Sequence, residues 1–146
     1  MKVVLDTNVL VSGLLNSKGN PAVVLTLALT GAIQVCHDKR ILAEYSEVLA
    51  RPRFKFDPIR VREVLIKLEV DGLSFASSNT MLNLPDPDDE PFLDTALAAS
   101  ADYLITGNTA DYPPAKCHGM HVISPADFVA LWRTLHPETG NPMAPD

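Results

Sequence analysis

Four carboxylate residues that lie far apart in the chain occupy positions suited to chemistry: Asp6, Glu44, Asp89 and Asp111. Two carboxylates about 4 Å apart repel by about 4 kcal/mol at an effective dielectric constant of about 20. A cluster of them is therefore stable only when it is protonated or binds cations. Carboxylate oxygens are hard ligands, which favour Mg²⁺ or Mn²⁺ over zinc. If the fold brings the four residues together, the sequence predicts a Mg²⁺ or Mn²⁺ site.

The histidines do not offer an alternative metal site. Their spacing is not that of zinc ligands, and we expect all of them to be structural or surface residues: His37, His118, His121 and His136.

Short apolar runs alternate with helical patterns along the chain. We expect strands over residues 3–5, 33–36, 73–75, 103–106 and 121–123. We expect helices over residues 21–30 (closed by Gly31), 38–50, 58–70, 89–101 and 125–135. This alternation predicts an α/β fold, an open parallel sheet of four or five strands with helices on both faces.

Asp6 and Asp111 follow two of the predicted strands. Ligands bind open parallel sheets beyond the carboxyl ends of the strands. Asp6 directly follows the first strand, and Asp111 lies five residues after Thr106, where the fourth strand is expected to end. The structural alternative is that Asp6 caps the next helix, for which Thr7 and Asn8 are equal candidates, and that Asp111 is an ordinary loop residue.

Glu44 lies at the border of a buried helix face. At about 100° per residue, the helix over residues 38–50 gathers its apolar side chains on one stripe: Ile41, Leu42, Tyr45, Val48 and Leu49. Glu44 falls at the edge of this stripe, whereas Glu47 points nearly opposite and is expected in solvent. A carboxylate at the edge of a buried face loses hydration unless something compensates it. The alternative is an ion pair between Glu44 and Arg40, one turn earlier.

Asp89 belongs to an acidic cluster over residues 86–90. The following helix is expected to bury Phe92, Leu93, Ala96 and Leu97, and Asp89 stands at the N-terminal end of that face. Asp94, turned by about 140°, should face away. Asp88 and Glu90 are expected to complement the helix dipole. The alternative for Asp89 is a helix N-cap, and one residue could serve both purposes.

Composition limits the class of protein. The chain has 146 residues, of which 47% are hydrophobic, and this fits one domain with a sizeable core. A net charge of −6 excludes a polycation, so any contact with nucleic acid must be local. Cys36 and Cys117 are too few for a disulfide framework and are expected to be buried thiols.

We expect neither a signal peptide nor a membrane-spanning segment in this sequence. The first residues become polar too soon for a signal peptide, and no run of 18 apolar residues occurs. We therefore expect a soluble, cytoplasmic domain over residues 1–135. Residues 136–146, rich in proline and polar residues, are expected to be a flexible tail.

Four sequence blocks, in this order, resemble the PIN-domain superfamily, and above all the toxins of type II toxin–antitoxin systems akin to virulence-associated protein C. The blocks are VVLDTNV over residues 3–9, EYSEVL over 44–49, DEPFLDTALA over 89–98 and LITGNTADYP over 104–113. The likeness runs from about residue 1 to 130. It implies a three-layer α/β/α nuclease that cleaves single-stranded RNA with Mg²⁺ or Mn²⁺.

The same resemblance assigns roles to the acidic residues. Asp6, Glu44, Asp89 and Asp111 would form a catalytic, metal-binding quartet. We expect Asp6 and Asp89 to hold the principal ion, with Asp111 as a further direct or water-mediated ligand. Glu44 would hold a second ion or position the attacking water.

Three polar residues would support the quartet in this reading. Asn8 and Thr106 would orient the carboxylates. Many relatives have aspartate where this chain has Asn108. Because an amide oxygen adds no negative charge, the number of bound metal ions, one or two, stays open.

A basic segment offers a path for the substrate. Residues 39–67 hold eight of the 12 basic residues and four acidic ones, a local charge of about +4. We expect Arg51, Arg53, Lys55 and Arg60 to guide the RNA backbone, with Phe54 or Phe56 stacking on a base. The alternative is a solvated face whose two phenylalanines belong to the core. An acidic antitoxin segment could use the same groove, and the resemblance is compatible with a homodimer or higher oligomer.

Three other functions are compatible with parts of this pattern. An aspartyl-nucleophile phosphatase also begins with an aspartate after the first strand, but it needs a second aspartate where this chain has Asn8. It also needs a late lysine, and Lys116 is the only lysine after Lys67. A receiver-like signalling domain meets the same shortage. A non-enzymatic PIN-fold module that binds nucleic acid or protein is the remaining alternative, and Asn108 favours it.

Overall fold

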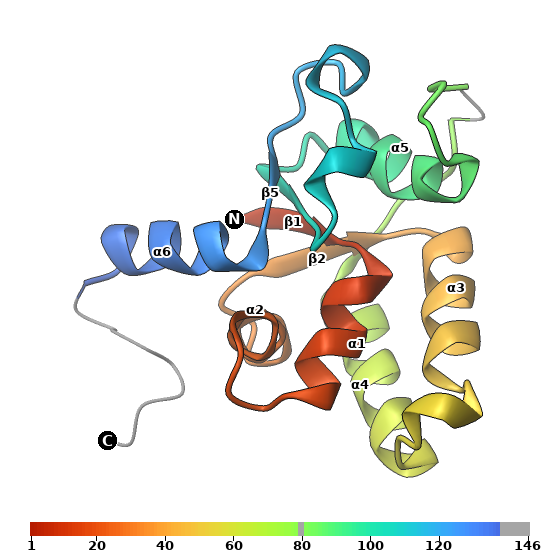
Figure 1. Cartoon of the computed structure of the whole chain (residues 1–146), viewed down its shortest axis with the longest axis vertical. Helices are drawn as coiled ribbons and strands as arrows, with labels where there is room; N and C mark the ends of the chain where they lie inside the picture. Colours follow the sequence, from red (N-terminus) through yellow and green to blue (C-terminus); the bar gives the residue numbers. More distant parts are fainter. Residues whose placement is uncertain (79–80, 138–146) are drawn as a thin grey trace.

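The sheet confirms the predicted fold class. The computed structural model describes residues 1–78 and 81–137 (Figure 1). In these residues one all-parallel, five-stranded sheet has the order β3-β2-β1-β4-β5. The strands are β1 (Lys2–Leu5), β2 (Gln34–His37), β3 (Leu73–Ser74), β4 (Tyr103–Ile105) and β5 (Val122–Ile123). Most of the tail expected over residues 136–146 lies outside the described residues.

Helices flank the sheet. They are α1 (Thr7–Leu15), α2 (Asn20–Leu29), α3 (Lys39–Leu49), α4 (Pro58–Asp71), α5 (Glu90–Ala99) and α6 (Pro125–Leu135). One short 3₁₀ turn, η1 (Pro52–Phe54), joins α3 to α4, and another, η2 (Pro87–Asp89), leads into α5. Two more, η3 (Thr109–Asp111) and η4 (Pro114–Lys116), lie between β4 and β5. Helix α5 packs on β1, β2 and β4, and α6 packs on α2 (Figure 1).

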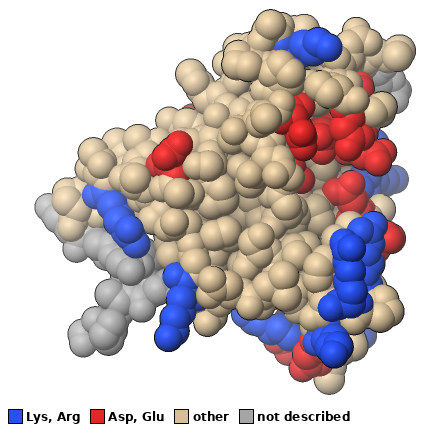
Figure 2. All heavy atoms as spheres, in the orientation of Figure 1, with Lys and Arg blue, Asp and Glu red and all other residues tan. Residues whose placement is uncertain are grey.

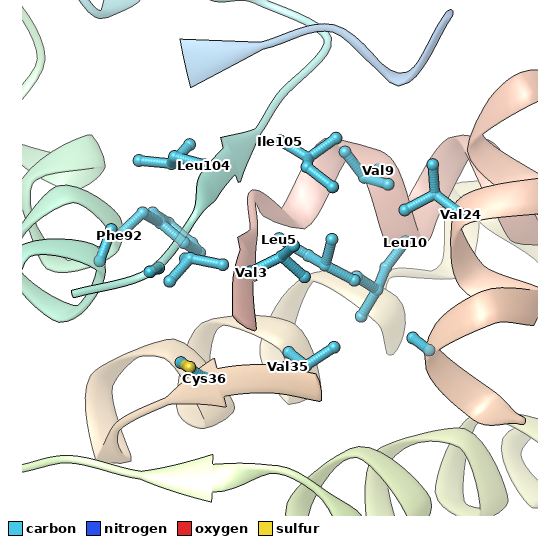
Figure 3. Packing of buried hydrophobic residues seen from close by; sticks show 14 of the residues in the cluster. Val3, Leu5, Val9, Leu10, Val24, Val35, Cys36, Phe92, Leu104 and Ile105 are labelled. Atoms are coloured by element: carbon cyan, nitrogen blue, oxygen red, sulfur yellow. The ribbon is translucent and has the colours of Figure 1, made fainter. Parts of the chain in front are cut away.

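The central strand is completely buried. Val3, Val4 and Leu5 have no exposed surface, because helices cover both sides of the sheet. Successive residues point to opposite sides: Cys36 lies toward Phe92 of α5, whereas Val35 lies toward α1 and α2 (Figure 3). The expectation of buried, unpaired thiols is also confirmed.

Helix α1 was not predicted, because the first helix expected from the sequence began near residue 21. The chain enters a helix immediately after Asp6, and Val9 and Leu10 bury themselves in the core. A Cβ atom on Gly13 would stand 3.0 Å from the carbonyl oxygen of Pro21, so glycine lets α1 and α2 approach closely. The predicted end of the next helix is confirmed, since Gly31 has a φ of +80°.

No helix in residues 1–78 or 81–137 is long and apolar enough to cross a lipid bilayer.

Candidate active site

Asp6 is held by hydroxyl groups at the carboxyl end of the central strand. It is 7% exposed, and its Oδ2 accepts hydrogen bonds from Thr106 Oγ1 at 2.8 Å and from the Tyr112 hydroxyl at 3.2 Å. Because β1 pairs with β4 in the register Leu5–Ile105, Asp6 and Thr106 leave the sheet side by side. Asp6 occupies the N-cap position of α1, but its carboxylate makes no capping hydrogen bond. The alternative of a purely capping Asp6 is therefore wrong.

Burial raises the pKa of Asp6 above its ordinary value. The hydrogen bonds from Thr106 and Tyr112, together with the nearby amides of Asn8 and Thr7, oppose this shift but do not cancel it. Burial and the negative charges of Asp6 and Asp89 also raise the pKa of Tyr112. The phenol therefore stays protonated and remains a donor to Asp6.

Asn8 links the ends of β1 and β4. Its Oδ1 accepts from the amide of Gly107 at 2.9 Å, and its Nδ2 donates to Thr106 Oγ1 at 3.3 Å. The amide of Asn108 also donates to Thr106 Oγ1, at 3.1 Å. Thr106 is thus the centre of a small network whose outward hydrogen bond goes to Asp6. This matches the orienting positions expected for Asn8 and Thr106.

Glu44 faces the same end of the sheet from α3. Its carboxylate accepts a hydrogen bond from the hydroxyl of Thr7, the residue after Asp6. Burial is the largest cause that raises the pKa of Glu44, and the charge of Asp6 adds to it. The expected pairing of Glu44 with Arg40 is wrong, because Arg40 binds Asp38 and Asp94 instead.

Asp89 lies at the end of η2, where α5 begins. It occupies the N-cap position of α5, as the alternative for it expected, but its carboxylate makes no capping hydrogen bond. Its Oδ2 is buried and has no hydrogen-bond partner. Burial first, and then the charges of Asp6, Asp86, Asp111 and Glu44, raise the pKa of Asp89 from 3.8 to about 7. The four predicted acidic residues are therefore electrostatically coupled around Asp89.

Asp111 ends η3 and is exposed to solvent. Its negative charge contributes to the raised pKa of Asp89. Asn108, at the other end of η3, is also exposed. Both residues lie on the segment that follows β4, as the sequence predicted.

The donor set fits a hard divalent cation, although the carboxylates do not form a ready-made cage. In the described part of the chain, no three His, Cys, Asp or Glu side chains lie close enough to hold a metal ion as they stand. The unpartnered Asp89 Oδ2 is an oxygen donor that a cation would satisfy. Binding an ion would therefore draw the coupled carboxylates closer together.

Of two further acidic residues near the site, Glu47 lies where the sequence predicted and Asp94 does not. Glu47 is exposed and pairs with Arg51 at 2.9 Å, as its predicted position in solvent implies. Asp94 does not face away: it is 5% exposed, because Arg40 and the segment holding Ser77 and Ser78 cover it.

The basic segment, residues 39–67, runs from α3 through η1 into α4. The Arg53 guanidinium lies 4.7 Å from the centre of the Phe54 ring, and Phe54 stacks on Phe56 with the ring centres 5.4 Å apart. Phe56 packs against the core, which is what the structural alternative expected of it. A cavity of about 450 Å³ beside it is lined by Lys55 and Arg60 and floored by apolar residues of α1 and α2. Figure 2 shows basic and acidic side chains gathered on the same face.

The sequence suggested no role for Tyr112, and for Thr7 it suggested only that of an alternative helix cap. Tyr112 directly follows Asp111, and Thr7 directly follows Asp6. Adjacency to a candidate carboxylate was the available signal, but the direction of the two hydroxyls depends on tertiary structure.

Comparison with protein families supports the resemblance. The sequence profile of the PIN domain matches residues 2–110, about three quarters of the chain. The match includes Asp6, Glu44 and Asp89 and ends one residue before Asp111. Comparisons with curated proteins and with solved structures gave no match. The chain belongs to the PIN domain family, a family of nucleases.

Proposed function

We propose that this protein is a Mg²⁺- or Mn²⁺-dependent endoribonuclease that cleaves single-stranded RNA, and that it is the toxin of a toxin–antitoxin pair. Membership of the PIN domain family supports phosphodiester hydrolysis. The observation that carries the proposal is the half-buried Asp89. Its buried Oδ2 has no hydrogen-bond partner, and burial together with the charges of Asp6, Asp86, Asp111 and Glu44 raises its pKa.

In this proposal Asp6 and Asp89 hold the principal ion, and Asp111 adds a direct or water-mediated ligand. The bound ion would supply an activated water and screen the phosphate from the carboxylates. Glu44 holds a second ion or positions the attacking water through a carboxylate that Thr7 already orients.

The chain's neutral groups support these roles. Thr106 and Tyr112 donate to the same oxygen of Asp6, which orients the carboxylate. Asn8 fixes the Thr106 hydroxyl and, as an amide, cannot serve as the acid–base group of an aspartyl phosphatase. Asn108 can add an uncharged oxygen ligand.

Single-stranded RNA is the proposed substrate because of the likeness to toxins, and the basic segment gives it a path. Arg51, Arg53, Lys55 and Arg60 would bind backbone phosphates. Phe54, which carries Arg53 on its ring, offers a stacking surface beside them. An acidic antitoxin segment would compete for the same basic groups.

Cleavage of end-labelled single-stranded RNA by the purified protein tests the enzyme. We expect products with Mn²⁺ or Mg²⁺, none with a chelator, and none from Asp6→Asn. Glu69→Gln removes an exposed carboxylate from α4 and should cleave normally. RNA binding without metal-dependent cleavage would refute the enzyme and favour the non-enzymatic binding module.

Expression in a bacterial host tests the toxin. The wild-type protein should arrest growth, and co-expression of a small reading frame that neighbours the gene should relieve the arrest. Growth arrest by Asp6→Asn equal to that of the wild type would contradict the link between toxicity and the acidic site.

A further inference from the structure

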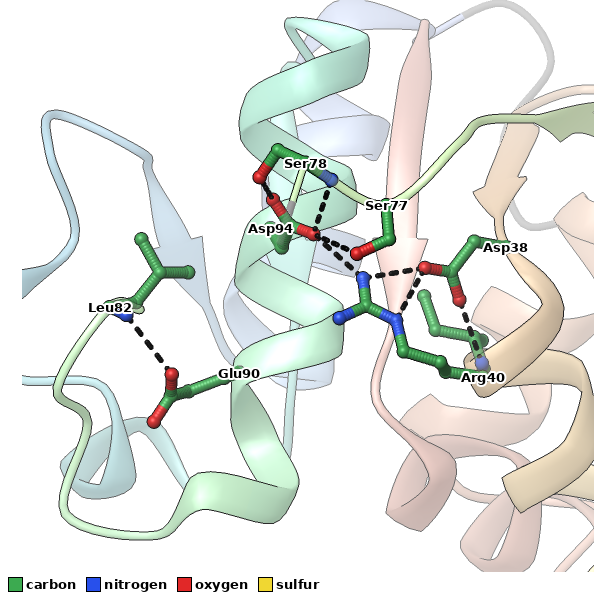
Figure 4. Close-up of polar contacts among 8 residues, drawn as sticks. Asp38, Arg40, Ser77, Ser78, Leu82, Glu90 and Asp94 are labelled. Carbon is green, nitrogen blue, oxygen red and sulfur yellow. Dashed lines mark hydrogen bonds and ion pairs between the residues drawn. The ribbon is translucent and has the colours of Figure 1, made fainter. Parts of the chain in front are cut away.

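Arg40 connects two helices that each position a candidate metal ligand. Its Nη2 donates to Asp38 Oδ2 at 2.6 Å and to Asp94 Oδ2 at 2.7 Å, and its Nε donates to Asp38 Oδ2 at 2.8 Å (Figure 4). Arg40 lies in the first turn of α3, whereas Asp94 lies on α5. The guanidinium group of Arg40 therefore binds a carboxylate, that of Asp94, which lies 54 positions away in the sequence.

The two carboxylates of the bridge are buried, and the exposed Arg40 reaches them from the surface. Asp38 is 3% exposed and caps α3, because its Oδ1 accepts from the amide of Ile41 at 2.9 Å. Asp94 also accepts hydrogen bonds from the hydroxyl of Ser78, from its amide at 3.3 Å and from Ser77 Oγ at 3.4 Å. A surface ion pair contributes little order, but buried carboxylates with several donors hold a fixed geometry.

The bridge lies one helical turn from Glu44 and close to Asp89. Glu44 follows Arg40 by four residues on α3, and Asp89 directly precedes α5. Helix α3 packs more extensively on α1 and α4 than on α5. The rings of Tyr45 and Phe92 make another contact between the two helices, with their centres 6.3 Å apart. Two separated contacts fix the orientation of α3 relative to α5, which one contact cannot do.

The Arg40 guanidinium pairs with Asp38 and Asp94, which are separate from the four carboxylates of the candidate site. Its positive charge is matched by Asp38 and Asp94, so any effect on the site must come through the placement of the helices.

We infer that Arg40 and Asp94 are positioning residues, whose bridge between α3 and α5 sets the separation of Glu44 from Asp89 and thereby the affinity for the divalent cation. This inference rests on the proposed function. It extends the site to two residues that touch neither the ion nor the RNA.

Calorimetric titration with Mn²⁺ tests the inference. In Arg40→Lys a single ammonium group replaces the fork that bonds both carboxylates. Asp94→Asn keeps the shape of the side chain but removes its charge and one of its two acceptor oxygens. We expect each variant to bind Mn²⁺ about 10-fold more weakly than the wild type, the low end for residues that support a metal ligand. Lys67→Gln is the matched control, because it breaks an exposed ion pair with Asp71 on α4 and should bind Mn²⁺ normally.

Two further measurements separate positioning from other roles. Circular dichroism in chelator must first show that each variant is folded at the titration temperature. If one of Arg40→Lys and Asp94→Asn unfolds, the other still decides the question. RNA binding in chelator should be unchanged, because Arg40 contacts no substrate in this inference.

The outcomes are distinct. Folded variants that bind Mn²⁺ like the wild type would overturn the inference, and so would a loss of RNA binding with unchanged Mn²⁺ affinity. If the wild-type protein itself binds no Mn²⁺ and cleaves no RNA, the proposed function fails, and that result is visible before any variant is compared.

Discussion

Replacing Asp89 with asparagine should stabilise the metal-free protein at neutral and alkaline pH. The pKa of this carboxyl is about 7 in the folded protein against an ordinary value of 3.8, first because of burial and then because of the nearby negative charges. The folded state therefore retains a proton that the unfolded chain releases. Stability that is fully present below pH 3.8 is lost as the pH rises through about 7. Asparagine is neutral and lacks this loss.

The size of the effect follows from the pKa shift. At about 1.4 kcal/mol per pKa unit, the full shift corresponds to about 4 kcal/mol. Asp89 is only half-buried, so solvent screens part of this energy. We expect Asp89→Asn to raise the free energy of unfolding by about 1–2 kcal/mol at pH 8 and to change it little near pH 4.

Urea unfolding in the presence of a chelator, at steps from pH 4 to pH 8, measures this difference. Glu69→Gln, which removes an exposed carboxylate from α4, should follow the wild type at every pH. The reasoning is refuted if Asp89→Asn is less stable than the wild type by the same amount at pH 5 and pH 8. That result would mean that burial and the neighbouring charges do not raise the pKa of Asp89 in the folded protein. The stabilised variant should also lose Mn²⁺ binding and cleavage, because stability and function oppose each other at this residue.

Three further substitutions test the surroundings of the site. Tyr112→Phe keeps the buried ring and removes the hydrogen bond to Asp6, so unfolding free energy should fall by about 1 kcal/mol; an unchanged value would remove the phenol from the network. Thr106→Val deletes a hydroxyl that serves Asp6, Asn8 and the amide of Asn108, and should cost about 1–3 kcal/mol by the same measurement; a smaller loss than for Tyr112→Phe would contradict its central place. Arg53→Ala should weaken RNA binding and reduce the slope of log affinity against log salt by about 1. An unchanged slope in a filter-binding titration would exclude Arg53 from the RNA path.

Much of the fold could be predicted because it depends on local patterns. The buried run Val3–Leu5 and the β-branched or apolar segments at 33–36 and 103–106 indicated strands, and the sheet uses all of them. Helix α6 has the predicted bounds, Pro125–Leu135, because a capping serine and a proline mark its start. Helical spacing singled out Glu44 over Glu47, and its place at the N-terminal end of a predicted buried face singled out Asp89.

The missed features depend on tertiary contacts. Helix α1 lacks a capping side-chain hydrogen bond and contains a glycine, so its sequence favours a helix only weakly; packing against α2 decides it. Helical geometry placed Asp94 away from the buried face, but it could not foresee a guanidinium from another helix. The pairing of Arg40 was predicted within its own helix because sequence spacing gives only local partners.

The carboxylates of Asp38 and Asp94 and those of the candidate site receive different hydrogen-bond donors. This difference explains why the candidate site is suited to a cation. Asp38 and Asp94 share Arg40, and their negative charge is partly neutralised inside the chain. At the end of the central strand, Asp6 and Glu44 receive hydrogen bonds from neutral hydroxyls instead. Among the described residues no lysine or arginine pairs with Asp6, Glu44, Asp89 or Asp111. Hydroxyl donors orient a carboxylate but leave its charge intact, so the repulsion that raises the pKa of Asp89 is relieved only by protons or by a metal ion. Arg40 thus holds Asp38 and Asp94 in a fixed geometry, whereas the hydroxyl donors leave the negative charge of the candidate site uncompensated.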